Sequence, residues 1–288
     1  MKLVGLLIVI VGVFSGYLLG GGHMAPLIHA APHEMMTIGG AAIGAFLISN
    51  SMHTIKATAK NLNCLIKPEA HNKESYMELL SVLYLLFKLA RTKGWLALES
   101  HIEQPDDSEL FKQFPTFHHN HHAILFLCDY LRIISLGKEN PHEIEALMDE
   151  EIETINTEKM HPSHAMQTMA DGIPALGIVA AVLGVIKTMG SISEPPEVLG
   201  KMIGGALVGT FLGVFLAYGF VGPIAGALGG KGESEVLYYR CIKMAMIAFL
   251  NGSPPQVAVE FARKFLPHHV QPTFMELEEK LNELPSPG

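Results

Sequence analysis

A single threonine is the first candidate for chemistry inside the apolar segments of this chain. Thr210 is almost the only hydroxyl in the long apolar stretch from 202 to 230. A lone threonine in a membrane helix usually donates to the carbonyl four residues before it, although it can also line a narrow aqueous path. Both interpretations stay open from the residue alone.

Two prolines, Pro174 and Pro223, lie within or at the ends of apolar stretches. Each removes a backbone donor and tends to kink a helix. Membrane helices tolerate proline, so ordinary packing is one interpretation. The other is a hinge, or a carbonyl freed beside an ion path.

Carboxylates are missing from the middle of the apolar stretches. The two nearest acids, Glu34 and Asp171, stand at the ends of stretches, where helix capping is the default explanation. A proton or cation path through a membrane normally needs a carboxylate at membrane depth. If this chain conducts ions, the sequence therefore predicts that a second chain supplies that carboxylate.

The enzyme-like patterns fail on inspection. Residues 229–232 lack the spacing of a phosphate-binding loop, and His33-Glu34 begins no zinc-binding HExxH motif. The cluster of His118, His119, His121 and His122 implies no ordered geometry, so a solvated loop is the simpler interpretation. We predict no enzyme, no metal site and no cofactor. The net charge of −8 also argues against nucleic acid as a partner.

The elements that must position these residues are predicted to be membrane helices. Only 17% of the residues are charged. Stretches without Asp, Glu, Lys or Arg cover residues 3–22, 35–55, 172–186 and 202–230, and Met166 to Ala170 extend the short third stretch. About 20 apolar residues cross a bilayer core of about 30 Å. The sequence therefore predicts an all-α membrane protein with four transmembrane helices and a helical cytoplasmic domain.

The predicted organisation has four parts. Two helices and a short outer turn occupy residues 1–52, a cytoplasmic loop 53–166, two more helices 167–230, and a cytoplasmic tail 231–288. The loop and the tail carry eleven and six Lys and Arg residues, whereas the first outer turn has none. Basic residues favour the cytoplasmic side, so both termini are predicted to lie there.

Helical periodicity recurs within the predicted loop. Apolar residues at helical spacing between Leu79 and Ala90 predict one helix, 125–134 a second, and Pro141 onward a third. A charged amphipathic helix is predicted for Met275 to Glu283. Residues 105–122 are predicted to be a polar, His-rich connection.

Arg91 and Glu99 stand at the end of the first predicted loop helix. On one continuous helix they would be about 12 Å apart, too far for a mutual salt bridge, and Gly94 could break the helix between them. A solvated face and two separate contacts with a charged partner are both open.

Gly205, Gly209 and Gly213 recur every four residues along one face of the fourth predicted membrane helix. Small residues at this spacing let helix backbones approach closely. The contact could lie within one chain or between subunits around a central partner.

Segments taken in order along nearly the whole chain resemble the MotA/PomA family of flagellar stator proteins. They are RTKGWLALES, FLCDYLR, EIEALMDEEIET, GIPALGIVAAVLG, ALVGTFLGVFLAYGFVGPIAG, NGSPPQVAVEFARKFL and FMELEEKL. The resemblance implies a pentameric ring around a MotB dimer, which supplies the membrane aspartate. It also implies a multi-pass protein of the bacterial inner membrane, embedded in lipid, in which proton flow drives torque on the rotor protein FliG.

The resemblance also implies roles for individual residues. Arg91 and Glu99 would be the main rotor-contacting charges, with Glu151 a weaker candidate. Pro174 and Pro223 would couple ion binding to movement of the loop.

Ion selectivity is read from three positions at which the sodium-type relatives carry threonine. This chain has Ala180-Ala181 in the third membrane segment and Gly209-Thr210 in the fourth, and Thr210 would face the ion path. Sodium needs several oxygen ligands, whereas a proton needs one titratable group and water. The resemblance therefore favours protons. A sodium-driven PomA-type stator is one alternative, and a three-span energy-transducing ring of the ExbB/TolQ class is another.

Overall fold

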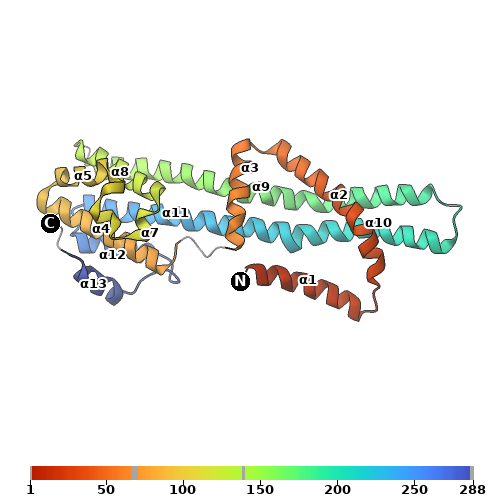
Figure 1. The fold of residues 1–288 in the computed structure, drawn as a ribbon. Helices are drawn as coiled ribbons and strands as arrows, with labels where there is room; N and C mark the ends of the chain where they lie inside the picture. Colours follow the sequence, from red (N-terminus) through yellow and green to blue (C-terminus); the bar gives the residue numbers. More distant parts are fainter. Residues whose placement is uncertain (1, 67–70, 138–139, 286–288) are drawn as a thin grey trace. The chain divides into compact units, whose positions relative to one another are not determined.

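The computed structural model describes residues 2–66, 71–137 and 140–285, and within them it consists of helices without a strand (Figure 1). This confirms the predicted all-α class. The chain divides into two compact units. Unit 1 comprises residues 1–68 and 160–231, and unit 2 comprises 69–159 and 232–288.

Unit 1 is built from long helices. They are α1 (Lys2–Leu19), α2 (Met24–Ser49), α3 (Met52–Asn61), η1 (Leu62–Leu65), the second part of α9 (Pro141–Met189), α10 (Pro196–Leu216), the π-helical turn η4 (Ala217–Val221) and the beginning of α11 (Gly222–Leu250). The second part of α9 and α10 run antiparallel across a short turn at 190–195 (Figure 1).

Three helical stretches of the described chain are long and apolar enough to cross a membrane. They are α1, α9 and the rod Pro196–Leu250, which joins α10, η4 and α11. Helix α2 is also long enough, with 26 residues, but it contains His29, His33 and Glu34, which make it less apolar.

Helix α2 begins earlier than the sequence predicted. It runs from Met24 to Ser49, whereas the charge-free stretch covers 35–55. The hydroxyl of Ser51 accepts from the Thr54 N–H at 3.2 Å and so begins the separate helix α3. The first turns of α2 lie before the charge-free stretch, because Glu34 stands inside the helix.

Helix α9 is continuous over 49 residues, with Pro162 and Pro174 inside it. The boundaries predicted at 166 and 230 therefore fall inside continuous helices, α9 and α11. The sequence separated a charged half from an apolar half of each helix, but a change in polarity does not end a helix that has no capping signal.

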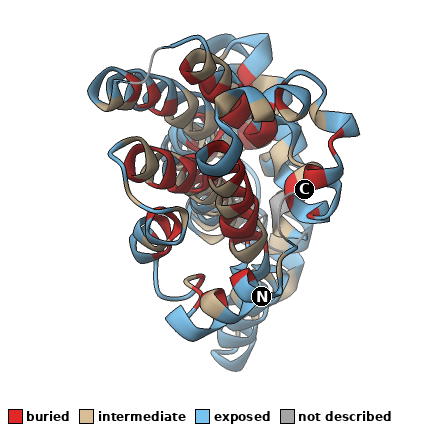
Figure 2. Cartoon of the chain, turned by 90° about the vertical axis from the view of Figure 1, so that its left-hand side faces the viewer, coloured by how far each residue is buried: buried red, intermediate tan, exposed pale blue. Residues whose placement is uncertain are grey.

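Unit 2 comprises shorter helices around a large apolar core. They are α4 (Lys73–Lys93), η2 (Trp95–Leu98), α5 (Glu99–Glu103), η3 (Pro105–Asp107), α6 (Glu109–Lys112), α7 (Pro115–His118), α8 (His121–Ser135), the first part of α9, the rest of α11, α12 (Pro255–Phe265) and α13 (Phe274–Glu283). Figure 2 shows the buried positions on the sides of these helices that face the interior of the unit.

The connection at 105–122 is more structured than predicted. Phe111 and Phe117 are fully buried in the core of unit 2. The Glu78 carboxylate on α4 accepts from the Thr116 N–H at 2.8 Å and from the Phe117 N–H at 3.1 Å. This carboxylate therefore caps α7 from a distant part of the chain, which local sequence does not reveal.

Candidate functional site

Helices α9 and α10 meet along a seam of small residues in unit 1. A Cβ atom added to Gly213 would lie 2.8 Å from the Gly177 Cα atom, and one added to Gly184 would lie 2.9 Å from the Ala206 Cα atom. Real Cβ atoms do not approach backbone this closely, so the two helices touch through their backbones. This is the contact that small residues at four-residue spacing permit.

The three predicted packing glycines do not share one neighbour. Gly209 and Gly213 face α9, where the added Cβ of Gly209 would lie 3.0 Å from the Ala181 backbone nitrogen. Gly205 faces α2, and its added Cβ would lie 3.8 Å from the Ala30 Cβ atom. Within one chain, therefore, two of these glycines serve the α9–α10 seam and the third serves the contact with α2.

The predicted ion-path residues lie at one level of the seam. Ala181 and Thr210 are both half-buried, and Gly209, next to Thr210, contacts Ala180 and Ala181. The structure therefore places Ala181 and Thr210 at the same level of two neighbouring helices, with Gly209 making the contact.

Pro174 lies inside α9, one residue after a carbonyl that faces the seam. The Ile173 carbonyl oxygen would lie 3.2 Å from a Cβ atom on Gly213. Because proline has no N–H, the buried Ala170 has no helical donor for its carbonyl. Pro174 itself is half-buried.

Pro223 follows a π-helical turn that the sequence did not predict. In this turn the Gly222 N–H donates to the Ala217 carbonyl, five residues before it. A proline clashes with the carbonyl four residues before it in an α-helix, and the wider turn makes room for the ring. Pro223 is exposed and lies further along the rod than Thr210, so the structure does not bring the two prolines together at the seam.

The capping interpretation of Glu34 and Asp171 is wrong. Both residues lie inside helices, Glu34 in α2 and Asp171 in α9. Asp171 is exposed and accepts from the Gln167 side-chain amide at 2.8 Å. Glu34 is half-buried, and its Oε2 atom would lie 2.9 Å from a Cβ atom on Gly209. The chain therefore carries its own carboxylate within a long helix of unit 1, which the sequence analysis missed.

Glu34 lines a cavity of about 750 Å³ in unit 1. Helices α2, α9 and α10 form its walls. Its polar lining comprises His29, His33, Glu34, Thr37, Lys187, Thr188 and Lys201, and Ala180, Gly205 and Ala206 are among the small residues that complete it.

Arg91 and Glu99 lie on different elements of unit 2. Gly94, with φ +83°, ends α4 after Arg91, and Glu99 begins α5. Glycine adopts this left-handed conformation without the strain that a Cβ atom would bring. Both side chains are exposed, and neither has an ion-pair partner among the described residues.

Glu151 on α9 is exposed but has a partner. The buried Tyr130 hydroxyl on α8 donates to its carboxylate at 2.7 Å. Burial, followed by this hydrogen bond, raises the pKa of Tyr130. Glu151 is therefore tied to the core of unit 2, whereas Arg91 and Glu99 are not.

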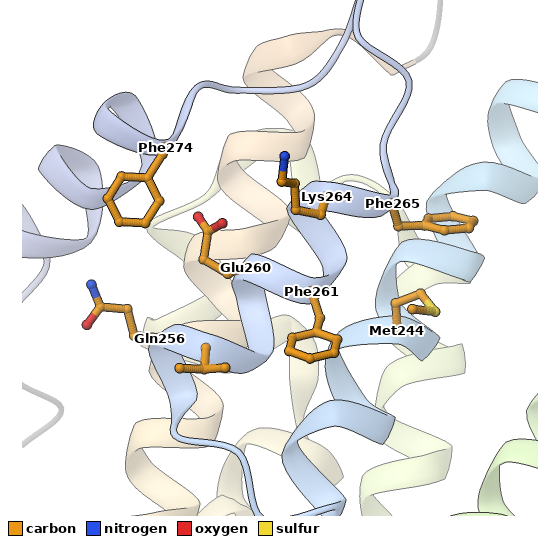
Figure 3. Close-up of a pocket in the computed structure, with 8 residues that line it drawn as sticks. Met244, Gln256, Glu260, Phe261, Lys264, Phe265 and Phe274 are labelled. Carbon is orange, nitrogen blue, oxygen red and sulfur yellow. The ribbon is translucent and has the colours of Figure 1, made fainter.

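An apolar hollow of about 560 Å³ lies beside α12 in unit 2 (Figure 3). Phe261, Phe265 and Phe274 line it, and the nearby Glu260 carboxylate accepts from Arg263 Nε at 2.8 Å. The hollow contains no set of nucleophile, base and orienting group. Among the described residues, no group of three or more His, Cys, Asp or Glu side chains could hold a metal ion.

Comparison with known families first defines the class. Residues 119–240 match the MotA/TolQ/ExbB proton channel family, and residues 3–94 match the motility protein A N-terminal family. The match to the motility protein A N-terminal family is the more specific one. It covers the N-terminal helices and α4, which lie outside the match to the broader MotA/TolQ/ExbB proton channel family.

Individual relatives are similar over the full length. Motility protein A of Salmonella typhimurium is 43% identical over 286 residues, covering 99% of this chain and 96% of that protein. Motility protein A of Escherichia coli is 42% identical over 285 residues, with coverage of 99% and 96%. This chain belongs to the motility protein A family. The resemblance inferred from the sequence is thereby confirmed.

The fold matches a solved complex. The structure described as the flagellar MotAB stator complex from Bacillus subtilis has a TM-score of 0.73 and 26% sequence identity to this chain. The match covers 92% of this chain and 95% of that chain.

Proposed function

We propose that this chain is the membrane subunit of a flagellar stator, which conducts protons together with a MotB-type partner. The single observation that carries the proposal is the full-length similarity to motility protein A. The similarity to a solved MotAB stator complex supports it. Membership of the proton channel family over residues 119–240 supports the proton as the conducted ion.

The membrane arrangement we propose has four spans, with α2 as the fourth. Helix α2 packs mainly against α10 and has 26 residues, about 39 Å at 1.5 Å per residue, which exceeds a bilayer core of about 30 Å. Lys and Arg residues occur in the segments between α2 and α9 and after α11, whereas the turns at 20–23 and 190–195 contain none. Basic residues favour the cytoplasmic side, so the two basic segments lie in the cytoplasm. The chain then occupies the inner membrane with both termini inside, and lipid surrounds its apolar faces.

The ring we propose contains five copies around a MotB dimer, and the membrane aspartate comes from that dimer. In this ring, the level of the seam that contains Ala181 and Thr210 faces the partner. Ala180, Ala181 and Gly209 carry no side-chain oxygen, which favours a proton over a sodium ion. A sodium-driven stator is the alternative that the experiment below distinguishes.

Torque in this proposal is delivered by unit 2 to the rotor protein FliG. Arg91 and Glu99 are exposed charges that have no ion-pair partner among the residues that the structure describes, which suits an external contact. Glu151 is a weaker candidate because Tyr130 already donates to it. Pro174 and the π-helical turn before Pro223 supply the bendable points in α9 and in the Pro196–Leu250 rod.

The test is motility in a strain that lacks its own stator. Production of this chain with a single-span partner that bears one membrane aspartate should restore swimming, and the partner should copurify with the chain. Swimming should persist without sodium and should stop when a protonophore is added. Swimming speed that scales with sodium concentration would identify the sodium-driven alternative, and copurification without any swimming would overturn the motor function.

A further inference from the structure

The cavity beside Glu34 has features of a proton-uptake site. It opens between the beginning of α2, the end of α9 and the beginning of α10, so its lining includes residues near the turns at 20–23 and 190–195. In the proposed topology these turns lie on the outer side of the membrane. Glu34 and Ala180 lie further along the helices, away from the turns.

The Glu34 carboxylate is not held by another side chain of the described residues. Within the described part of the chain it forms neither a hydrogen bond nor an ion pair. The two hydroxyls of the cavity are already engaged, since Thr37 donates to the His33 carbonyl at 3.1 Å and Thr188 donates to the Gly184 carbonyl at 2.9 Å. A carboxylate at membrane depth needs a partner, water or a proton, so this one suits proton exchange with water in the cavity.

Gly209 makes the position of this carboxylate possible. A Cβ atom at residue 209 would lie 2.9 Å from Glu34 Oε2 and 3.0 Å from the Ala181 backbone nitrogen. Without a side chain at 209, the carboxylate lies against the α9–α10 seam at the level of Ala181 and Thr210. Glu34 therefore connects the cavity to the level where the ion path is proposed.

The charges around Glu34 favour a proton over other cations. His29 and His33 come from α2, Lys187 from α9 and Lys201 from α10. The two ammonium groups repel sodium, which must diffuse past them as an intact ion. A proton instead moves by transfer between water and titratable groups, and imidazole and carboxyl groups both accept it.

We propose that Glu34 is a proton-binding residue of this chain, and that the cavity lined by His29, His33, Lys187 and Lys201 delivers protons to it from the outer side. Glu34 takes a proton from a hydronium ion and leaves water. It then releases the proton through water to the partner's carboxylate and returns to its ionised form. This inference rests on the proposed function, because it needs a conducting complex.

The experiment compares four forms of the chain, each produced with its partner in a strain without a stator. They are the unchanged chain, Glu34→Gln, Glu34→Asp and the control Glu197→Gln. Glu197 is an exposed carboxylate in the first turn of α10, outside the cavity lining. Fluorescent fusions count the assembled units, and the readouts are torque per unit and proton conductance at several external pH values with constant proton-motive force.

Glu34→Gln should assemble but conduct protons about tenfold more slowly or worse, since an amide neither binds nor releases a proton at physiological pH. Glu34→Asp should restore most of the conductance, and Glu197→Gln should match the unchanged chain. Unchanged conductance and an unchanged pH profile in Glu34→Gln would overturn the inference. Failure of the unchanged chain to restore motility would instead count against the proposed function.

A fifth form of the chain keeps the test decisive if Glu34→Gln does not assemble. Glu34→His retains a titratable group but shifts its ordinary pKa from about 4.3 to about 6.5. The external pH at which conductance changes should then move upward in assembled units. A purely structural role for Glu34 would leave that pH unmoved, and this result would also overturn the inference.

Discussion

The two units of this chain are stabilised by opposite kinds of packing. Unit 2 buries large side chains, and Tyr76, Phe87 and Phe117 are almost completely inaccessible. In unit 1 the closest contacts are made by glycine and alanine, as between Gly177 and Gly213. Many large apolar side chains of unit 1 remain exposed on the outside, although a small group that includes Ile38, Val208 and Leu212 is buried.

The difference follows from the solvent that each unit faces. Burying an aromatic side chain away from water stabilises unit 2, at about 25 cal/mol per Å² of apolar surface. Lipid is as apolar as leucine, so the same burial contributes little in unit 1, and close backbone approach stabilises it instead. Leu207 and Ile186, 65% and 62% exposed, therefore suit contact with lipid.

The largest expected effect comes from adding a side chain to the seam of unit 1. Gly213→Leu should prevent α9 and α10 from packing, because its Cβ atom would meet the Gly177 backbone, which cannot rotate away. We expect no assembled protein in the membrane, measured with a fluorescent fusion. Gly204→Leu is the control, since no atom of another described helix lies within 4 Å of a Cβ atom there. Equal amounts of assembled Gly213→Leu and Gly204→Leu protein in the membrane would show that the α9–α10 seam does not stabilise unit 1.

The matching change in unit 2 is the removal of a large side chain. Phe87 is stacked on Phe249 with ring centroids 4.5 Å apart. Phe87→Ala should lower the free energy of unfolding of unit 2 by about 3–5 kcal/mol. Trp95 is the only tryptophan of the chain and packs edge-on against Phe249, so its fluorescence reports this transition in the detergent-solubilised protein. Leu96→Ala, at a side chain that is 78% exposed, should change little.

A pH change should weaken unit 2 through one buried histidine. Burial is the main cause that lowers the pKa of His71 to about 4, against 6.5 ordinarily. Above pH 6.5 the ring is neutral in both the folded and unfolded states. As the pH falls from 6.5 to 4, the unfolded state binds the proton first, so the free energy of unfolding should fall by about 3 kcal/mol.

The His71 prediction is checked with Trp95 fluorescence in denaturant titrations at several pH values. His71→Phe should flatten the acid slope, and the control His122→Phe, at an exposed position, should retain it. An identical slope in the unchanged chain and in His71→Phe would contradict the assignment.

The smallest effect on stability is expected for the exposed charges of unit 2. Reversal of both Arg91 and Glu99 should change the free energy of unfolding by no more than about 0.5 kcal/mol, because neither side chain has an ion-pair partner in the described part of the chain. Torque per assembled unit should nevertheless fall, and charge reversals on the rotor should restore part of it. Normal torque after the double reversal would remove both residues from the rotor contact.

Much of this protein was determined by the sequence alone. Long charge-free stretches predicted α1, the apolar part of α9 and α10, because each charged residue at membrane depth is unfavourable whatever surrounds it. Leucine periodicity predicted α4, and Pro141 marked the beginning of α9. The ordered family segments led to the motility protein A family, which the comparisons confirm.

Only the tertiary structure decided where the remaining polar groups lie. Glu34 was read as a helix cap because the charge-free stretch begins after it, yet it lies inside α2 against Gly209. The aromatic residues at 111 and 117 lie in a polar, His-rich segment, and Glu78 caps α7, the helix that carries Phe117, from 38 residues away. The physical reason is the same in both places. Local patterns in the sequence show whether a residue suits water or lipid. The place of a carboxylate in the fold depends instead on distant backbone, which either leaves room for it, as at Gly209, or donates hydrogen bonds to it, as in α7.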